Sequence, residues 1–409
     1  DTADAIDTFI GSFDGNKLAD ETVLTSDDLK EYTAYSNPIL AKIGEGEYVR
    51  YATITDVIDA ANDGDTITLA AGTYDLSEPD SSGVFGDVLY INKPITLKGE
   101  EGENDVEIKG SVRIQSGNVT VNGLKFTEPV VMPFGDPDPI CIDINTGNYP
   151  NITITNCELA PNTPYVSGQA GPRHKGIVTS SSGAYDNLQI TNNTFSNLET
   201  AISLNPASTD AVDGVSNVTI SGNVADETNG AFAKLESVDT ATITGNEISA
   251  MTYIRPDWSG NNPSVNVKIN ANAFFGFGII VLDKAGQTAD FDISANYWHD
   301  IPTPSPENCV YIAYQGDVGE TVTPTMTSYY TTYDPEAADG EKLSGLVQYI
   351  TDTTQVAKEV VFEQVEGTNQ FKVYLQGRAT DEQGVATEDP ATIINLVSVD
   401  FRINIEGDA

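Results

Sequence analysis

The sequence predicts an all-β chain whose short strands follow one another as the coils of a single stack. Three observations predict this class: a nine-residue pattern recurs seven times, its apolar residues alternate as in strands, and Asn returns at one fixed position. At 409 residues the chain is also longer than one ordinary core fills. We therefore expect one elongated domain with at least one smaller satellite.

The nine-residue pattern defines the expected coil. Its copies begin at residues 118, 151, 187, 217, 240, 266 and 290, so their spacings are 33, 36, 30, 23, 26 and 24 residues. The second and fourth positions are apolar in each copy, as at Val119 and Val121, which is typical of a strand with one buried face. The ninth position is apolar again, from Phe126 to Trp298, where Trp298 is expected to close the core. Each coil would then bury its apolar face against its neighbours.

The seventh position of the pattern carries Asn in five successive copies. These residues are Asn193, Asn223, Asn246, Asn272 and Asn296. An Asn at a tight turn tolerates the left-handed backbone conformation, and its side chain can hydrogen-bond to the Asn one coil above. We therefore expect the five residues to form a column.

A second strand and an entry segment complete the repeat. Small residues followed by large ones recur between the copies, at 176–178, 201–203, 231–233 and 278–280. Near the start, residues 54–61 have the pattern of a short amphipathic helix, residues 62–65 that of a turn, and residues 66–74 that of a first strand and turn. Together these features resemble the right-handed parallel β-helix of the pectate-lyase-like superfamily, over residues 51–312. The resemblance implies that the helix caps the open end of the stack.

The flanking segments are expected to be separate units. Residues 1–50 form an acidic segment that packs on the cap or leads to it. Pro302, Pro304 and Pro306 indicate a linker, and residues 313–409 alternate like antiparallel strands. That alternation predicts a small β-sandwich module and resembles cohesin-like or Ig-like modules.

Composition excludes some functions. Lys and Arg number 20 against 61 Asp and Glu, so the formal net charge is −41, and nucleic acid is excluded as a partner because its phosphates need a basic surface. The three cysteines form no disulfide framework, although Cys141 and Cys157 are candidates for a pair, and no apolar run is long enough to cross a membrane. The opening residues suggest a processed protein or a fragment, and the composition suits a secreted or cell-surface protein. The oligomeric state is left open.

Two long insertions contain the candidate binding residues. Residues 160–175 and 250–264 are expected on the same side of the coil, walling a groove. The candidate ligand-binding residues are Tyr165, Arg173, Lys175, Tyr253, Arg255 and Trp258. Aromatic rings stack on sugars, and basic groups bind carboxylates or hydroxyls. The alternative is that the basic residues pair with nearby acids and the aromatic residues fold the loops onto the stack.

The sequence leans against catalysis. Arg173, His174, Lys175 and Arg255 are the candidate catalytic residues for a lyase, which needs a base and a cation that neutralises the enolate. The motifs of pectate lyases and of polygalacturonase-type hydrolases are missing, however. We therefore expect a non-catalytic, adhesin-like module that binds a polysaccharide or cell-surface glycan. The alternatives are a polysaccharide lyase or glycosidase acting on uronate polymers, and a structural or trimeric spike.

No cofactor or metal site is expected. Acidic loops at residues 136–139 and 334–341 could hold Ca²⁺ through oxygen ligands, but their spacing does not match that of a known calcium loop. Solvated charge is the favoured interpretation of both loops.

Overall fold

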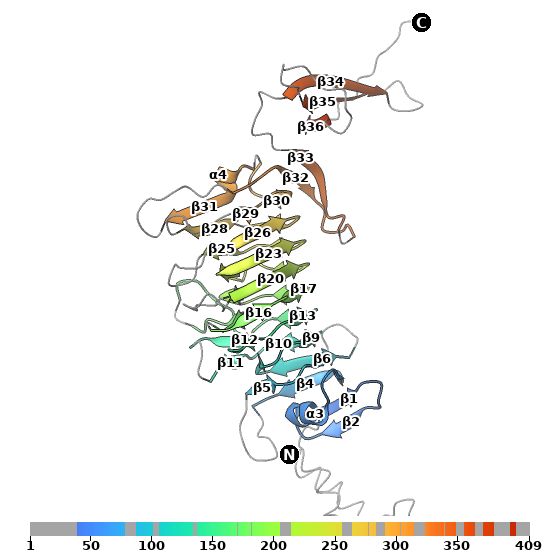
Figure 1. The fold of residues 1–409 in the computed structure, drawn as a ribbon, viewed down its shortest axis with the longest axis vertical. Coiled ribbons are helices and arrows are strands. Elements are labelled where there is room, and N and C mark those ends of the chain that lie inside the picture. Colours follow the sequence, from blue (N-terminus) through green and yellow to red (C-terminus); the bar gives the residue numbers. More distant parts are fainter. Residues whose placement is uncertain are drawn as a thin grey trace, which may run out of the picture.

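The computed structural model describes residues 39–77, 87–100, 106–133, 137–169, 171–180, 182–204, 214–255, 264–276, 278–283, 291–302, 304–314, 324–338, 340–348, 356–364, 371–379 and 393–397. Over most of this length the chain is a parallel β-helix, in which three long sheets run side by side along one stack (Figure 1). The all-β class and the stacked coils expected from the repeat are confirmed. We number the sheets I, II and III in the order in which the chain visits them within a coil.

Sheet I contains the strands in which the repeated pattern begins: β1 (Ile39–Ile43), β2 (Val49–Tyr51), β3 (Thr66–Leu69), β6 (Thr96–Gly99), β9 (Thr120–Asn122), β13 (Thr153–Thr155), β16 (Ala184–Asp186), β17 (Gln189–Thr191), β20 (Gly214–Ser221), β23 (Val238–Thr244), β26 (Val265–Asn270) and β29 (Phe291–Asp292). Sheet II contains the strands in which the pattern ends: β4 (Gly72–Asp75), β7 (Val106–Lys109), β10 (Lys125–Phe126), β14 (Glu158–Leu159), β18 (Thr194–Phe195), β21 (Val224–Ala225), β24 (Glu247–Ile248), β27 (Ala273–Phe274), β30 (Asn296–Trp298), β32 (Ser328–Tyr333) and β33 (Leu343–Gln348). Sheet III contains the second repeated strand: β5 (Val88–Ile91), β8 (Ser111–Ile114), β11 (Val130–Val131), β12 (Pro139–Ile144), β15 (Lys175–Thr179), β19 (Thr200–Leu204), β22 (Ala231–Glu236), β25 (Met251–Arg255), β28 (Ile279–Asp283) and β31 (Val310–Tyr314).

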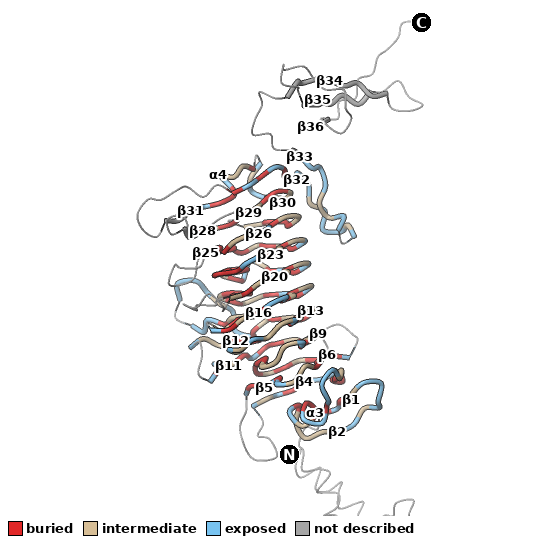
Figure 2. The backbone as a smooth tube through the Cα atoms, viewed as in Figure 1, coloured by how far each residue is buried: buried red, intermediate tan, exposed pale blue. Residues whose placement is uncertain are grey.

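The register of the strands builds the core inside the stack. In sheet I, Val121 pairs with Ile154 and Ile154 with Ile190, so equivalent apolar side chains lie on top of one another. The same holds in sheet II for Phe126 and Leu159. These residues are fully buried, and Figure 2 shows the buried positions recurring from coil to coil. Near the C-terminal end of the stack, Trp298 stacks on the ring one coil below it and closes the core as expected.

The five asparagines form the expected column through their side-chain hydrogen bonds, but they do not adopt the expected left-handed backbone conformation. Oδ1 of Asn223 accepts hydrogen bonds from both the backbone nitrogen and Nδ2 of Asn193, at 2.9 and 3.0 Å. The same pair of bonds joins each later pair of the column as far as Asn296. The left-handed conformation lies one residue earlier, at Asn192 (φ 56°) and its equivalents, so the expectation that the column residues themselves adopt it is wrong. The column residues therefore supply the hydrogen bonds between coils, and the residues just before them supply the left-handed backbone conformation of the turn.

A short helix caps the N-terminal end of the stack. α3 (Ile54–Ala60) begins at Thr53, whose side chain accepts a hydrogen bond from the backbone of Asp56 while Asp56 accepts one from the backbone of Thr53. At the other end, Nζ of Lys93 donates to three carbonyl oxygens of the last turn, each at 2.9 Å. β1 pairs antiparallel with β3. The expected boundary at residue 50 therefore lies within sheet I rather than between two units.

The stack also continues past the expected boundary at residue 312. The proline-rich segment leads into α4 (Pro306–Cys309) and β31, the last strand of sheet III, so it forms a further turn of the stack rather than a linker. β32 then pairs in parallel with β30, and β33 returns antiparallel to it. The described residues beyond residue 355 form one antiparallel sheet of β34 (Val356–Gln364), β35 (Phe371–Ala379) and β36 (Ile393–Val397). The β-sandwich remains a prediction.

The three cysteines are buried free thiols. Cys157 replaces Asn at the start of the column, where its backbone nitrogen donates to Oδ1 of Asn193, and burial raises the pKa of its thiol to about 12. The pairing of Cys141 with Cys157 that the sequence allowed does not occur. Neither helix in the described part of the chain has the length and apolar character needed to cross a bilayer.

Candidate functional site

The outer face of sheet III presents one residue from each coil in a straight row. Residues alternate along each strand, so Leu89 and Ile91 point into the core while Tyr90 between them points outward. The register then aligns the outward residues of successive strands. This outer row consists of Tyr90, Arg113, Asp143, Val178, Ser203, Lys234, Tyr253, Ile280 and Tyr311.

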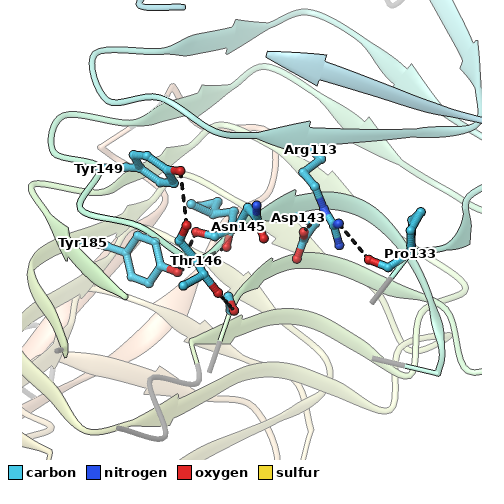
Figure 3. A network of polar contacts seen from close by, with 9 residues as sticks. Arg113, Pro133, Asp143, Asn145, Thr146, Tyr149 and Tyr185 are labelled. Atoms are coloured by element: carbon cyan, nitrogen blue, oxygen red, sulfur yellow. Dashed lines mark hydrogen bonds and ion pairs between the residues drawn. The ribbon is translucent and has the colours of Figure 1, made fainter. Parts of the chain in front are cut away.

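Most of the N-terminal half of the outer row, from Arg113 to Val178, is covered by other segments of the chain, whereas Tyr90 at its start is 39% exposed. Nε of Arg113 lies 2.6 Å from Oδ2 of Asp143, and Nη1 of Arg113 donates to the carbonyl oxygen of Pro133 at 2.9 Å (Figure 3). Both side chains of the ion pair are only 8% exposed. Val178 packs in a small apolar cluster with Met132 on the same face. The row from Arg113 to Val178 is therefore closed to a large ligand.

From Lys234 onward the outer row is partly exposed, reaching 68% at Tyr311, and it carries a charged and aromatic cluster. We call this part of the row its open half. Nζ of Lys234 lies 3.0 and 3.2 Å from the two carboxylate oxygens of Glu199, and Thr200 donates to the same carboxylate. Tyr253 lies beside Lys234 on the neighbouring strand. We call Tyr165, Lys175, Glu199, Thr200, Lys234 and Tyr253 the Glu199 cluster. Lys175, Thr200, Lys234 and Tyr253 are linked to that carboxylate by contact or by charge, and Tyr165 is linked to Tyr253.

The proximity of these groups shifts the pKa values of Glu199 and Tyr253. Burial alone would raise the pKa of Glu199, but the hydrogen bond from Thr200 and the charges of Lys234 and Lys175 outweigh it, so this pKa lies below its ordinary value. The pKa of Tyr253 is raised by burial, and further by the charge of Glu199 and by Tyr165. The cluster therefore holds an ionised carboxylate beside the phenol of Tyr253, which stays protonated at physiological pH.

The lowered pKa of Glu199 predicts a particular pH dependence of stability. A carboxylate with a depressed pKa stabilises the fold above its ordinary pKa of 4.5, and this contribution is lost as the pH falls through the lower folded value. Glu199→Gln is therefore expected to reduce the free energy of unfolding by about 1 kcal/mol at pH 7, with the difference narrowing below about pH 4.5. Denaturant unfolding of both proteins between pH 7 and pH 3.5 measures this. A difference that does not change with pH would contradict the assignment, because all other carboxyl groups titrate in both proteins.

Four of the sequence-predicted residues lie in or next to the insertion at 160–175. Lys175 is the first residue of β15 and forms an ion pair with Asp138 at 3.3 Å. The ring of Tyr165 is half-buried beside Gly230, where an added Cβ would lie 2.8 Å both from that ring and from the carbonyl oxygen of Glu199. His174 is buried, which lowers its pKa, and Arg173 is exposed to solvent. The structure thus brings Tyr165 and Lys175 into the cluster and leaves His174 under the loop.

The expectation that the two insertions lie on the same side of the coil is wrong. Residues 160–174 connect sheet II to sheet III, whereas the residues after β25 connect sheet III back to sheet I. Met251–Arg255 were assigned to the second insertion but form β25, because Thr252 and Ile254 point inward as in any strand of the sheet. Register places Lys175 and Arg255 at opposite ends of sheet III, about 13 Å apart along the strands. Tyr253 therefore joins the cluster, whereas the backbone of Arg255 lies at the other end of the sheet, and Trp258 lies outside the described residues.

Lys234 and Thr200 are members of the cluster that the sequence did not single out. Lys234 follows the small-then-large motif at 231–233, in the first outward position after it. The alternation rule that found the core could have found this residue if it had been applied to the outer face. Thr200 carries no comparable signal, because its role depends on the side chain of the residue before it.

No three His, Cys, Asp or Glu side chains converge on a possible metal position within the described parts of the chain. The acidic turn that begins at Asp334 is exposed, and Asp334 accepts a hydrogen bond from the backbone of Glu336. Solvated charge, rather than bound calcium, stays the prediction for these loops.

Comparison with known proteins adds little to this geometry. No family model matches the sequence, and no curated protein matches it. Among solved structures, the chain is similar to one described as a new PL6 alginate lyase in complex with a trisaccharide, with 11% sequence identity and a TM-score of 0.26. The match covers 71% of this chain and 88% of the lyase. The assignment of the fold rests on the strand register described above.

Proposed function

We propose that the Glu199 cluster binds a polysaccharide without cleaving it, and that the chain is a glycan-binding, adhesin-like module of a secreted or cell-surface protein. The observation that carries the proposal is the placement of Tyr253 next to the Lys234–Glu199 pair on the open half of the outer row. A half-buried phenol offers a ring face for stacking on a sugar. The adjacent ammonium and carboxylate offer a donor and an acceptor for sugar hydroxyls.

The open half of the row also suits a polymer. Beyond Tyr253 the row continues through Ile280 to Tyr311, which is 68% exposed. Adjacent coils are about 4.8 Å apart, so Tyr253 and Tyr311 are separated by about 10 Å along the stack. A chain of sugars lying along the stack would meet a residue of the row at each coil.

The contacts of the basic groups favour binding over catalysis. Elimination by a lyase needs a base that is free to take the proton next to the uronate carboxylate. Lys234 donates to both oxygens of Glu199, and Lys175 is paired with Asp138. Both lysines thus act as donors in this arrangement. His174, the remaining candidate base, is buried beneath the loop.

Binding measurements with single variants test the proposal. The probes are immobilised alginate, polygalacturonate, xylan and β-glucan, with affinity measured for the unchanged protein, Tyr253→Ala and Lys234→Met. Both substitutions are expected to weaken binding by about tenfold or more, because each removes a central contact. Lys268→Met is the matched control, because it removes the same charge from an exposed position on the outer face of sheet I and should leave binding unchanged.

The lyase alternative predicts that the uronate polymers among these probes are cleaved. Unsaturated products absorb in the ultraviolet, so incubation with uronate polymers, with and without Ca²⁺, reveals turnover directly. Turnover that is lost in Lys175→Met or Lys234→Met would replace the binding proposal with catalysis. Failure to bind any of the four polymers would refute the proposal itself.

A further inference from the structure

Four aromatic rings gather on the outer face of sheet II, near the C-terminal end of the stack. Phe275 follows β27, Tyr297 lies in β30, His299 follows β30, and Tyr333 ends β32. The ring centroids of Phe275 and Tyr333 are 5.0 Å apart, those of Phe275 and His299 5.6 Å, and those of Tyr297 and Tyr333 5.9 Å. We call these four residues the aromatic tetrad.

The aromatic tetrad is not part of the hydrophobic core. Phe274 and Trp298, which neighbour its members in sequence, point inward and stack with their centroids 4.3 Å apart. Alternation then directs Phe275, Tyr297 and His299 to the outer face. The rings of Phe275, Tyr297 and Tyr333 are half-buried, and the side chain of His299 is 56% exposed. Partly exposed aromatic rings grouped in this way mark interaction surfaces more often than isolated ones do.

Polar groups frame the tetrad and are mostly acidic. Nζ of Lys342, in the β32–β33 hairpin, lies 2.7 Å from Oε1 of Glu247 in β24, which is three strands from β32 in sheet II. The pKa of Tyr333 is raised by burial, by a hydrogen bond to Glu247 and by the charges of Glu247 and Asp334. Asp300 adjoins His299, so three carboxylates surround the rings and the nearby lysine is already paired with one of them.

We propose that the aromatic tetrad is a second carbohydrate-binding surface, specific for a neutral polymer of equatorially substituted hexoses such as a β-glucan. Such sugars have flat apolar faces that stack on aromatic rings, and their hydroxyls donate to carboxylates. The acidic frame repels a uronate polymer, as does the net charge of −41. The surface lies on sheet II and the Glu199 cluster on sheet III, so binding at one does not depend on the other.

The tetrad also holds the β32–β33 hairpin in place, and a test must separate the two roles. Figure 1 shows this hairpin turned back alongside the stack, where Tyr333 contacts Phe275 and Lys342 contacts Glu247. Glu247→Gln weakens the attachment of the hairpin while all four rings remain. Tyr297→Ala removes a ring supplied by the stack itself.

Calorimetric titration with cellohexaose, laminarihexaose and hexagalacturonate tests the inference. The unchanged protein should bind a neutral oligosaccharide through the tetrad, whereas any binding of the galacturonate should be unaffected by Tyr297→Ala. Tyr297→Ala and Phe275→Ala should each weaken that binding by about tenfold or more, while Glu247→Gln should weaken it less and Lys268→Met, on sheet I, should leave it unchanged. Tyr253→Ala, in the Glu199 cluster, is titrated with the same oligosaccharides to show which of the two sites binds each of them. Thermal unfolding of each variant shows whether it is folded. If Tyr297→Ala or Phe275→Ala fails to fold, His299→Ala replaces it as the variant tested, because His299 is the most exposed ring of the tetrad.

Three outcomes would overturn this inference: binding to neither neutral oligosaccharide, galacturonate binding that is lost in Tyr297→Ala, or binding of the neutral sugar that is lost in Tyr253→Ala and kept in Tyr297→Ala. The last outcome would locate binding on sheet III and leave the proposed function standing. Conversely, an unchanged affinity for neutral sugar in Tyr253→Ala, with no polymer bound at the Glu199 cluster, would refute the proposed function and leave the tetrad as the site.

Discussion

Asn223→Ala is expected to lower the free energy of unfolding by about 3 to 5 kcal/mol, because it leaves several buried polar groups without partners. Oδ1 of Asn223 accepts from the backbone nitrogen and Nδ2 of Asn193, and Nδ2 of Asn223 donates to the carbonyl oxygen of Ile190 at 2.9 Å. All of these groups are buried, and Asn223 itself is 0% exposed, so water cannot replace the lost bonds without opening the stack.

Two further variants show whether hydrogen bonding causes the loss. Asn122→Ala removes an exposed asparagine that accepts one bond from Asn156 at 2.9 Å, and it should cost less than about 1 kcal/mol. Asn223→Asp keeps the size and the acceptor but loses the donor to Ile190 and buries a charge, so it should be as damaging as alanine. Denaturant unfolding combined with hydrogen exchange at the coils on either side provides the measurement, since a stack can open locally. Equal stability of Asn223→Ala and Asn122→Ala would show that the column contributes little.

The fold was predictable because each coil repeats the same physical requirements. A residue such as Ile190 must point inward in every coil, so its equivalents recur at one position of the pattern, and Asn223 recurs for the same reason. The residue with the left-handed backbone conformation was predicted one position too late, at the column itself. Asn, Gly and Ala all occur at the true position just before the column, so no single residue type marks it.

The candidate site was only partly predictable because it depends on what each coil inserts. Tyr253 was read as part of a loop, since the strand around it is short and the residues that follow it are polar. Once the register is known, its place beside Lys234 follows directly. The position of Glu199 in the centre of the cluster depends on the rotation of side chains at the corner between two sheets, which no periodic pattern records. The aromatic tetrad likewise depends on a hairpin that folds back over earlier coils.

The ion pair of Arg113 and Asp143 is the second feature with a large expected effect. Asp143→Ala is expected to reduce the free energy of unfolding by about 3 to 5 kcal/mol, because it leaves the guanidinium of Arg113 buried without its carboxylate. The loss should also loosen the segment ending at Pro133, whose carbonyl oxygen Arg113 binds. Hydrogen exchange should therefore rise in residues 127–133 at denaturant concentrations below the main unfolding transition.

A double substitution separates the net contribution of the ion pair to stability from the destabilisation caused by removing only one of its two charges. Arg113→Met with Asp143→Leu removes both charges and keeps apolar volume at the site, so it should recover much of the stability that Asp143→Ala loses. The partly exposed pair of Lys125 and Glu158, whose charged atoms lie 2.8 Å apart, supplies the comparison: Glu158→Ala should cost less than about 1 kcal/mol. If Asp143→Ala and Glu158→Ala cost the same, the covered half of the outer row is open to water. The contrast between a closed half and an open half, on which the placement of the glycan site depends, would then no longer hold.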